Sequence, residues 1–369
     1  LRMEKRFRIV PRGVGLVIGC CTFPTWNGYP GLFASLATGN AVVVKPHPAA
    51  ILPLAISVRI IRDVLAEAGF DPNVVTLVAH AAGDPTAQQL ALRPEVKLID
   101  FTGSSANGNW LEANARQAQV YTEKSGVNQV VVDSVADLKA VARNLGFSLS
   151  LYTGQMCTAP QNIYIPRGGI ETPEGHKSFD DVANAIAEGV RKLLGDPARA
   201  VEVLGAVQNR GVLDRLDQAR GLGPILLDTQ ALPHPAFPDA NVRTPLIVEL
   251  DARDGDKYLS EWFGPIAFLI ATDSTDQSLS IARDAVKRHG ALTLALYSKD
   301  PKVVDHAIEV AEDAGVALSI NLTSGVFVNQ SAAFSDFHGT GANPAANAAL
   351  TDAAFVANRF RVVQHRMHV

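Results

Sequence analysis

Cysteine is scarce in this sequence, which holds only Cys20, Cys21 and Cys157 among its 369 residues. Three cysteines cannot build a disulfide framework, and the neighbouring pair at positions 20 and 21 is poorly placed to bond to itself. We therefore expect a reduced, cytosolic protein rather than a secreted domain held together by disulfides.

A strong excess of one charge and a long hydrophobic run are also lacking. The formal net charge of −4 gives neither the basic surface that binds nucleic acid nor a polybasic patch for membranes. No apolar run is long enough to cross a bilayer, and no secretory signal is visible. We expect neither nucleic acid nor a membrane as a partner, and we assign no metal site. Because the chain opens with Leu1 and Met3 is poorly placed as an initiator, we expect a preceding N-terminal part.

What is present indicates a soluble enzyme with a large core. Hydrophobic residues make up 47% of the chain and charged residues 19%, which is typical of globular proteins. The length allows one very large domain or two or more ordinary ones.

Short apolar runs alternate with helical patterns in the first third of the chain. Strand, helix and strand at this spacing favour right-handed crossovers and a mainly parallel sheet. The expected strands are residues 13–18, 41–45, 74–78 and 96–101, with a helix over 52–68.

The same alternation continues to the end of the chain. Residues 222–240 contain four prolines and predict a surface excursion, and residues 339–349 predict a loop. The expected strands are residues 130–132, 163–165, 246–250, 266–271, 292–297 and 359–363, and the expected helices are 136–151, 182–194, 278–288 and 303–314.

The pairing of Cys157 with Glu123 carries the most chemical information. Cys157 lies in Gly-Gln-Met-Cys at 154–157, and Glu123 lies in Tyr-Thr-Glu-Lys-Ser-Gly at 121–126. Taken singly, such a cysteine is more often a small core residue and such a glutamate a surface group. Together, a thiolate that attacks a carbonyl and a carboxylate that activates water predict a covalent thio-intermediate followed by hydrolysis.

Three further motifs have both a binding and an ordinary interpretation. The turn Phe-Thr-Gly-Ser at 101–104 suits a phosphate at a helix N-terminus, or is a strand-to-helix turn with Ser104 as the helix cap. Lys45 ends a strand and would meet a ribose or phosphate there, or be solvated. The segment Glu-Trp-Phe-Gly-Pro at 261–265 offers a carboxylate for a sugar hydroxyl and a ring to pack, or a surface glutamate beside a half-buried aromatic.

In this order the five motifs resemble the aldehyde dehydrogenase superfamily, over nearly all of the chain from about Phe7. Glu123 and Cys157 are 34 positions apart (157 − 123), a separation typical of that family. The resemblance implies an α/β fold with a Rossmann-type cofactor domain, an α/β catalytic domain and a C-terminal oligomerisation strand, with the N-terminal part of the family fold missing. It implies a homo-oligomer, either dimer or tetramer. The implied divisions are 1–122 (partial cofactor domain), 123–330 (catalytic domain), 331–358 (return to the cofactor domain) and 359–369 (oligomerisation strand).

The resemblance also implies a mechanism, with Cys157 as the nucleophile and Glu123 as the base that hydrolyses the thioester. The cofactor would be NADP or NAD. Many family members carry a glutamate three residues after the lysine, where this chain has Pro48, and the loss of that charge favours NADP over NAD. The residues that match cofactor positions or adjoin them are Lys45, Pro46, Phe101, Thr102, Gly103, Ser104, Glu261 and Phe263.

The oxyanion of the thiohemiacetal needs a hydrogen-bond donor besides the Cys157 backbone N–H. The family asparagine aligns with Thr22 by spacing to Lys45, and with Asn27 in a looser alignment. We favour Thr22, and we expect Thr22→Ala to lower turnover more than Asn27→Ala. The reverse ranking would reject this alignment.

A finer resemblance is to the phenylacetic acid degradation branch, the PaaN and PaaZ type. It rests on residues 120–128, 154–160, 321–323 and 334–341. This branch implies a semialdehyde from aromatic-ring opening, either free or linked to coenzyme A. No hydratase-like extension follows Val369, so we expect no ring-opening activity within this chain.

Two other functions compete with this one. An acylating dehydrogenase would pass the acyl group to coenzyme A, although Glu123 argues for hydrolysis. Alternatively, the chain is a catalytically silent assembly partner, because family members carry a long N-terminal segment that this sequence does not contain. Without that segment the sheet would be incomplete, with exposed apolar edges. Poor solubility and no stabilisation by the cofactor would favour the silent chain.

Overall fold

The computed structural model describes residues 2–124, 126–333, 338–340, 346 and 353–369, which divide into two compact units. Unit 1 comprises Leu1–Lys124, Asp336–His338 and Ala345–Val369. Unit 2 comprises Ser125–Ser335 and Gly339–Pro344. Among the described residues, no helix is both long enough and apolar enough to cross a membrane.

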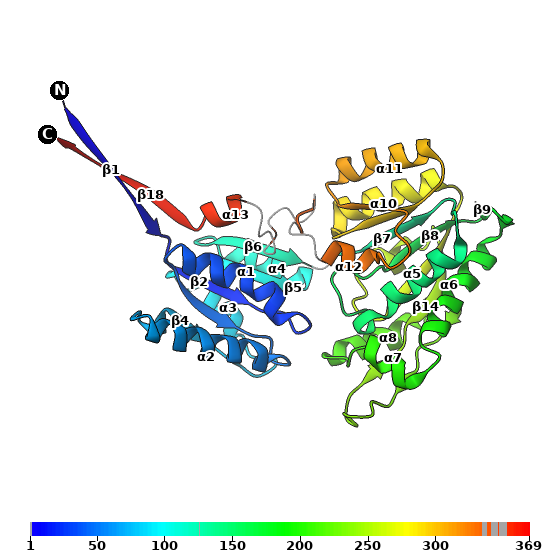
Figure 1. Ribbon diagram of the computed structural model, residues 1–369, viewed down its shortest axis with the longest axis horizontal. Helices are drawn as coiled ribbons and strands as arrows, with labels where there is room; N and C mark the ends of the chain where they lie inside the picture. Colours follow the sequence, from blue (N-terminus) through cyan, green and yellow to red (C-terminus); the bar gives the residue numbers. More distant parts are fainter. Residues whose placement is uncertain (1, 125, 334–337, 341–345, 347–352) are drawn as a thin grey trace. The chain divides into compact units, whose positions relative to one another are not determined.

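Unit 1 is built on a five-stranded parallel sheet in the order β4-β3-β2-β5-β6 (Figure 1). The chain runs outward from β2 to β3 and β4, and then returns to place β5 and β6 on the other side of β2. The order therefore reverses between β2 and β5, as in dinucleotide-binding sheets. The strands are β2 Val14–Ile18, β3 Ala41–Lys45, β4 Val75–Leu77, β5 Val96–Gly103 and β6 Gln119–Lys124.

Helices cover both faces of this sheet because its strands alternate their apolar side chains. Val17 of β2 packs in a cluster with Leu32 and Leu54, whereas Leu16 and Ile18 pack in another cluster with Leu111. The first face is covered by α1 Pro24–Ala37 and α2 Ile51–Glu67, and the second by α3 Thr86–Ala91 and α4 Ser105–Asn114. The short helix η1 Pro72–Val74 precedes β4.

The C-terminal segment returns to unit 1 through a buried ion pair. Arg359, which follows α13 Ala353–Ala357, donates to both carboxylate oxygens of Asp100 at 2.8 and 2.6 Å, and both side chains are 0% exposed. A Cβ on Gly31 would collide with the Asp100 carboxyl group, so this position of α1 has to be glycine. Beyond Arg359, β18 Phe360–His368 pairs antiparallel with β1 Met3–Pro11 in a ribbon that ends with both chain termini (Figure 1).

Unit 2 contains a seven-stranded sheet in the order β11-β14-β15-β8-β7-β16-β17, in which only the edge pair β11–β14 is antiparallel. Consecutive residues of β7 face opposite sides, so Val131 joins one core cluster and Val130 and Val132 join the other. The strands are β7 Gln129–Val132, β8 Asn162–Pro166, β11 Ile225–Leu227, β14 Leu246–Asp251, β15 Ile266–Thr272, β16 Leu294–Tyr297 and β17 Leu318–Ile320.

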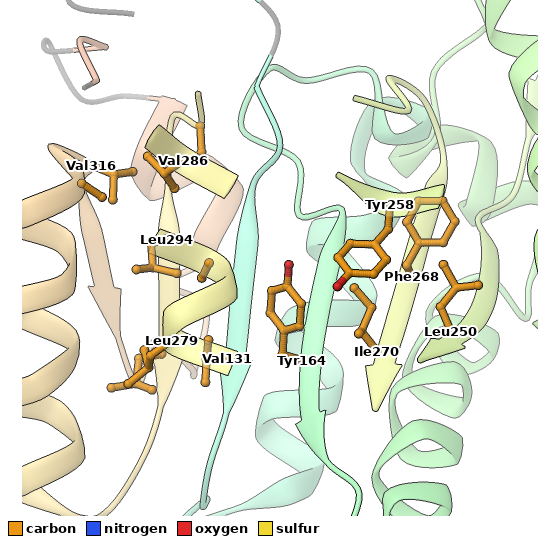
Figure 2. Close-up of a cluster of buried hydrophobic side chains, with 14 of the residues drawn as sticks. Val131, Tyr164, Leu250, Tyr258, Phe268, Ile270, Leu279, Val286, Leu294 and Val316 are labelled. Carbon is orange, nitrogen blue, oxygen red and sulfur yellow. The ribbon is translucent and has the colours of Figure 1, made fainter. Parts of the chain in front are cut away.

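The two faces of this sheet are covered by two pairs of long helices. On one side α10 Thr275–His289 and α11 Pro301–Ala314 pack on a cluster that includes Tyr164, Phe268 and Leu294 (Figure 2). On the other, α5 Leu138–Ser150 and α6 Phe179–Leu193 cross closely at Gly146 and Gly189. The smaller elements of unit 2 are η2 Leu151–Gly154, β9 Ile170–Thr172, β10 Gly175–Lys177, α7 Pro197–Val203, α8 Arg210–Ala219, β12 Ala231–Leu232, β13 Val242–Arg243, α9 Gly255–Tyr258 and α12 Val328–Ala333.

The structure corrects one local prediction and extends another. The proline-rich segment 222–240 is not only a surface excursion, because β11 within it joins the main sheet at its edge. The terminal strand expected at 359–363 is longer and runs over Phe360–His368. Much of the loop expected at 339–349, and of the motif segment 334–341, lies outside the described residues.

Candidate active site

Several of the candidate site residues predicted from the sequence lie at the carboxyl ends of the unit 1 strands. Lys45 ends β3, Gly103 ends β5, and Glu123 is the penultimate residue of β6. Cys20 and Thr22 follow the end of β2. Because the strands are parallel, these ends share one edge of the sheet, on both sides of the point where strand order reverses.

Lys45 is buried rather than solvated. Its side chain belongs to a residue that is 5% exposed, and no hydrogen bond or ion pair is found for its ammonium group in the described part of the chain. Burial lowers the pKa of Lys45 below that of an ordinary lysine. Pro46 beside it is also buried. A buried ammonium group of this kind suits a ribose hydroxyl or a phosphate.

The turn at 101–104 is a capped helix start. The Ser104 Oγ accepts the Asn107 N–H at 3.4 Å and caps α4. The Phe101 side chain is 5% exposed and lies in the core, whereas Thr102 and Gly103 are half-buried. The helix cap and a phosphate at the same N-terminus are compatible, because α4 still presents several backbone N–H groups.

Glu123 is a buried carboxylate. Its neighbours Thr122 and Lys124 point to the opposite side of β6, where both bond to Glu112 of α4. Glu123 is 1% exposed, its Oε2 lies 3.1 Å from Nδ1 of His338, and its Oε1 has no hydrogen-bond partner among the described residues. The ordinary interpretation, a solvated surface glutamate, is therefore wrong.

Asn27 and Cys20 lie next to one another in unit 1. The Cys20 thiol donates to Asn27 Oδ1 at 3.7 Å, whereas Asn27 Nδ2 is buried without a partner among the described residues. Burial raises the pKa of Cys20 to about 11, and the charges of Cys21 and Glu123 contribute. Thr22 is half-buried in the bend before α1. A buried amide donor without a partner is a position where a ligand oxygen fits.

In unit 2, Cys157 is half-buried on a loop whose backbone is tightly constrained. Three consecutive residues before it, Tyr152, Thr153 and Gly154, have φ values of 53°, 57° and 60°. A Cβ on Gly154 would lie 2.5 Å from the Gly264 carbonyl oxygen, so the loop approaches the segment 261–265 too closely for any other residue. This contact brings two of the sequence motifs together.

Buried amide side chains hold the same loop. Asn128 Nδ2 donates to the carbonyls of Cys157 and Ala159 at 2.8 and 2.9 Å, and its Oδ1 accepts the N–H groups of Leu292 and Thr293. Gln155 donates to two carbonyls and accepts one N–H in the same way. Asn128 had no predicted role of its own, since an isolated asparagine after Val127 carries no signal of such contacts.

Glu261 and Phe263 are half-buried beside this loop. Glu261 Oε1 accepts the Gly126 N–H at 3.3 Å, and the Phe263 carbonyl accepts from Arg215 at 2.9 Å. Glu261 thus binds a backbone N–H group within unit 2. No cluster of three or more His, Cys, Asp or Glu side chains that would hold a metal occurs among the residues described.

Comparisons with known proteins agree with this architecture. The family model described as "Aldehyde dehydrogenase family" matches residues 2–348. A solved NAD-dependent aldehyde dehydrogenase from Burkholderia multivorans is 71% identical with a TM-score of 0.96, covering 100% of this chain and 66% of that one. A 1-pyrroline-5-carboxylate dehydrogenase from Bacillus cytotoxicus is 27% identical, covering 82% of this chain and 58% of the relative. Vanillin dehydrogenase from a Pseudomonas strain is 26% identical, covering 83% and 60%.

The family model and the solved relative match almost the whole chain. The chain spans 40% to 60% of the length of the curated relatives it matches. The α/β fold with a Rossmann-type sheet, expected from the motifs, is confirmed by both the topology and the solved relative. The chain belongs to the aldehyde dehydrogenase family.

Proposed function

We propose that this chain oxidises an aldehyde to a carboxylic acid, with NAD or NADP as the hydride acceptor. The observation that carries the proposal is a pair of prepared groups: the cysteine on a loop anchored by Asn128, and the buried Glu123 with one open oxygen. The thiolate of Cys157 attacks the aldehyde carbon and forms a tetrahedral thiohemiacetal. Loss of hydride from that carbon leaves a thioester on Cys157.

The residues present fit a dinucleotide. Lys45 is a buried ammonium group at the sheet edge where strand order reverses, which suits a ribose or phosphate. The backbone of Thr102 and Gly103 leads into the N-terminus of α4, and Glu261 offers a carboxylate for a sugar hydroxyl. When bound, the nicotinamide supplies the acceptor for the hydride.

Which dinucleotide is preferred remains a prediction about this chain. Pro48 removes a carboxylate that would repel a 2′-phosphate and so favours NADP. The B. multivorans relative, in contrast, is named NAD-dependent. Initial rates with each cofactor decide between them, and a strong preference for NAD would reject the argument from Pro48.

For the substrate we propose a semialdehyde of aromatic catabolism, in keeping with the finer resemblance to the phenylacetic acid degradation branch. Two of the similar proteins are named for an aromatic aldehyde and for pyrroline carboxylate, so the family accepts substrates of differing shape. The residues 334–337 and 341 of the motif lie outside the described part of the chain, so the proposal rests on residues 120–128, 154–160 and 321–323.

The experiment that tests the function compares the wild-type chain with Cys157→Ala on benzaldehyde, phenylacetaldehyde and hexanal. We expect reduced nicotinamide to accumulate with the wild type and to fall at least about a thousandfold in the variant, because the nucleophile is lost. The free acid, rather than an acyl-CoA, should be the product when coenzyme A is added. Acyl-CoA would favour the acylating function, and equal activity of both proteins would refute the proposed mechanism.

A further inference from the structure

Unit 1 contains a histidine–glutamate contact that the reaction outlined above leaves without a role. Nδ1 of His338 lies 3.1 Å from Oε2 of Glu123, and the two side chains are 2% and 1% exposed. The residues are 215 positions apart in the chain. The contact therefore depends on the return of the C-terminal segment to β6.

Burial distinguishes this contact from similar ones in the molecule. His176 lies 3.0 Å from Glu171, and His306 lies 3.3 Å from Asp276, but in both cases the two side chains are at least 44% exposed. Among the described residues, only the His338–Glu123 contact is removed from water. Screening by water makes the exposed contacts weak, whereas a buried one fixes the orientation of both groups.

Residues of the C-terminal segment contact β6 on the face to which Glu123 belongs, at Tyr121 and at Glu123 itself. Tyr121, two residues before Glu123 and therefore on the same face, packs edge-on against Phe355 with ring centroids 5.1 Å apart. The guanidinium of Arg359 lies 4.7 Å from the centre of the Tyr121 ring. The ion pair of Arg359 with Asp100 thus anchors the C-terminal segment, to which His338 also belongs.

The two oxygens of Glu123 differ in their surroundings. Oε2 lies against His338, whereas Oε1 is buried without a hydrogen-bond partner among the described residues. A carboxylate acting as a base needs one oxygen held in place and one lone pair free for water. Because a carboxylate only accepts hydrogen bonds, the contact requires that Nδ1 of His338 carries a proton and donates it.

We propose that His338 is a positioning residue that orients Glu123 for hydrolysis of the thioester on Cys157. The inference rests on the proposed function. In this step the oxygen of water bonds to the acyl carbon, the carbon–sulfur bond breaks, and the sulfur leaves with the electron pair as the Cys157 thiolate. One proton of the water passes to Oε1 of Glu123, and the other stays on the carboxylic acid that is released.

The nearby Cys20, whose pKa the charge of Glu123 helps to raise, is a neutral thiol. It keeps its proton because burial raises its pKa to about 11. Its thiol donates to Asn27 instead. Among the described residues, the hydrogen-bond partner of the Glu123 carboxylate is His338.

The test uses the full chain and separates formation of the acyl-enzyme from its hydrolysis. The probe is p-nitrophenyl acetate, an activated ester that acylates a thiolate without any cofactor. Its first turnover releases a burst of p-nitrophenolate, and the later steady rate reports hydrolysis. The variants are His338→Ala, His338→Asn and His338→Gln, with His176→Asn as the matched control at an exposed histidine.

We expect His338→Ala to keep a burst of about one equivalent and to lose about 10- to 100-fold in steady rate, because an unoriented base is a poor one. His338→Asn should recover the rate to within about threefold of the wild type, since the asparagine amide nitrogen can take the place of Nδ1. His338→Gln, whose amide matches the position of Nε2, should stay close to the alanine variant. His176→Asn should behave as the wild type.

Three outcomes would overturn the inference: an unchanged steady rate in His338→Ala, an equal loss of burst and steady rate, or no recovery in His338→Asn. Thermal unfolding midpoints show whether each variant is folded. Failure of the proposed function looks different. In that case Cys157→Ala would keep the burst, or Glu123→Gln would keep the steady rate, whatever the histidine variants do.

Discussion

The buried polar groups at the sheet edge of unit 1 and at the cysteine loop of unit 2 differ in how many of their hydrogen bonds are made. In unit 1, Glu123 Oε1 and Asn27 Nδ2 have no partners among the described residues, and the ammonium of Lys45 is buried without an ion pair. In unit 2, Asn128 and Gln155 use both ends of their amides to bind backbone groups. Polar groups without a partner can bind a ligand or exchange a proton, whereas groups with all their hydrogen bonds made hold the Cys157 loop in place.

Unit 1 also contains the contrasting case, in which a buried pair is fully used. Arg359 donates to both oxygens of Asp100, to Ser35 Oγ at 2.9 Å and to the Phe355 carbonyl at 3.1 Å. This pair has no open atom of the kind found on Glu123, and we assign it to holding the C-terminal segment in place. Both Glu123 and the Asp100–Arg359 pair are buried. They differ in whether a polar atom is left without a hydrogen-bond partner among the described residues.

Breaking the buried Asp100–Arg359 ion pair should have the largest effect on stability. Asp100→Ala leaves a buried guanidinium without its counter-charge, and we expect a loss of about 3–5 kcal/mol. Urea unfolding followed by tryptophan fluorescence measures it. The double variant Asp100→Leu with Arg359→Met should regain most of the loss, because it removes both charges.

The matched control is Arg253→Met. Arg253 also binds both oxygens of an aspartate, Asp251, but it is 86% exposed. We expect only a marginal loss of stability there, because water screens the exposed pair. Equal losses at the two sites would contradict the assignment of Arg359 as the anchor.

Removing the amide that holds the cysteine loop should have an intermediate effect. Asn128→Ala leaves two carbonyls and two N–H groups without their hydrogen-bond partner, so we expect the free energy of unfolding to fall by about 2–4 kcal/mol. We also expect a changed rate of Cys157 alkylation by iodoacetamide. Asn144→Ala is the control, because Asn144 also donates to two carbonyls, those of Leu322 and Val326. It should lose comparable stability while Cys157 reacts as before. If both variants alter the reactivity equally, Asn128 has no special role at the loop.

The smallest effect concerns the protonation of Cys20. Its pKa is raised from 9.0 to about 11, so the folded chain holds this proton more tightly than the unfolded one. The resulting stabilisation is complete below pH 9 and is lost as the pH rises toward 11. Mapping of alkylated thiols by mass spectrometry should show Cys20 reacting about tenfold faster per pH unit across this window. Rapid labelling of Cys20 at neutral pH would show that it is not held as a neutral thiol.

Much of the sheet was predictable because buried parallel strands are apolar runs bounded by polar residues. Residues 41–45 and 130–132 are such runs, and they form β3 and most of β7. Helix α1 gave no usable signal, since it contains Pro30 together with Gly28 and Gly31. Packing against the sheet outweighs the low helix propensity of these residues, and Gly31 is required by its contact with Asp100.

The residues of the candidate site were predictable only where they belong to a local sequence motif. Cys157 and Glu123 stand in such motifs. His338 lies in the segment 334–341 that carries the finer resemblance, but its contact with Glu123 joins positions 215 residues apart and leaves no trace in the local pattern. The anchoring role of Asn128 was missed for the same reason, since it depends on backbone groups at 292–293 that the fold brings to it.

The pairing of Asp100 with Arg359, 259 residues later, also has a consequence for synthesis of the protein. Unit 2 is formed almost entirely from the continuous segment Ser125–Ser335, so all of its strands leave the ribosome before the last residues of unit 1. Domains usually complete in chain order from the N-terminus. Here the unit that is begun first is completed last. Until Arg359 emerges, the nascent chain carries Asp100 on β5 without the positive charge that balances it.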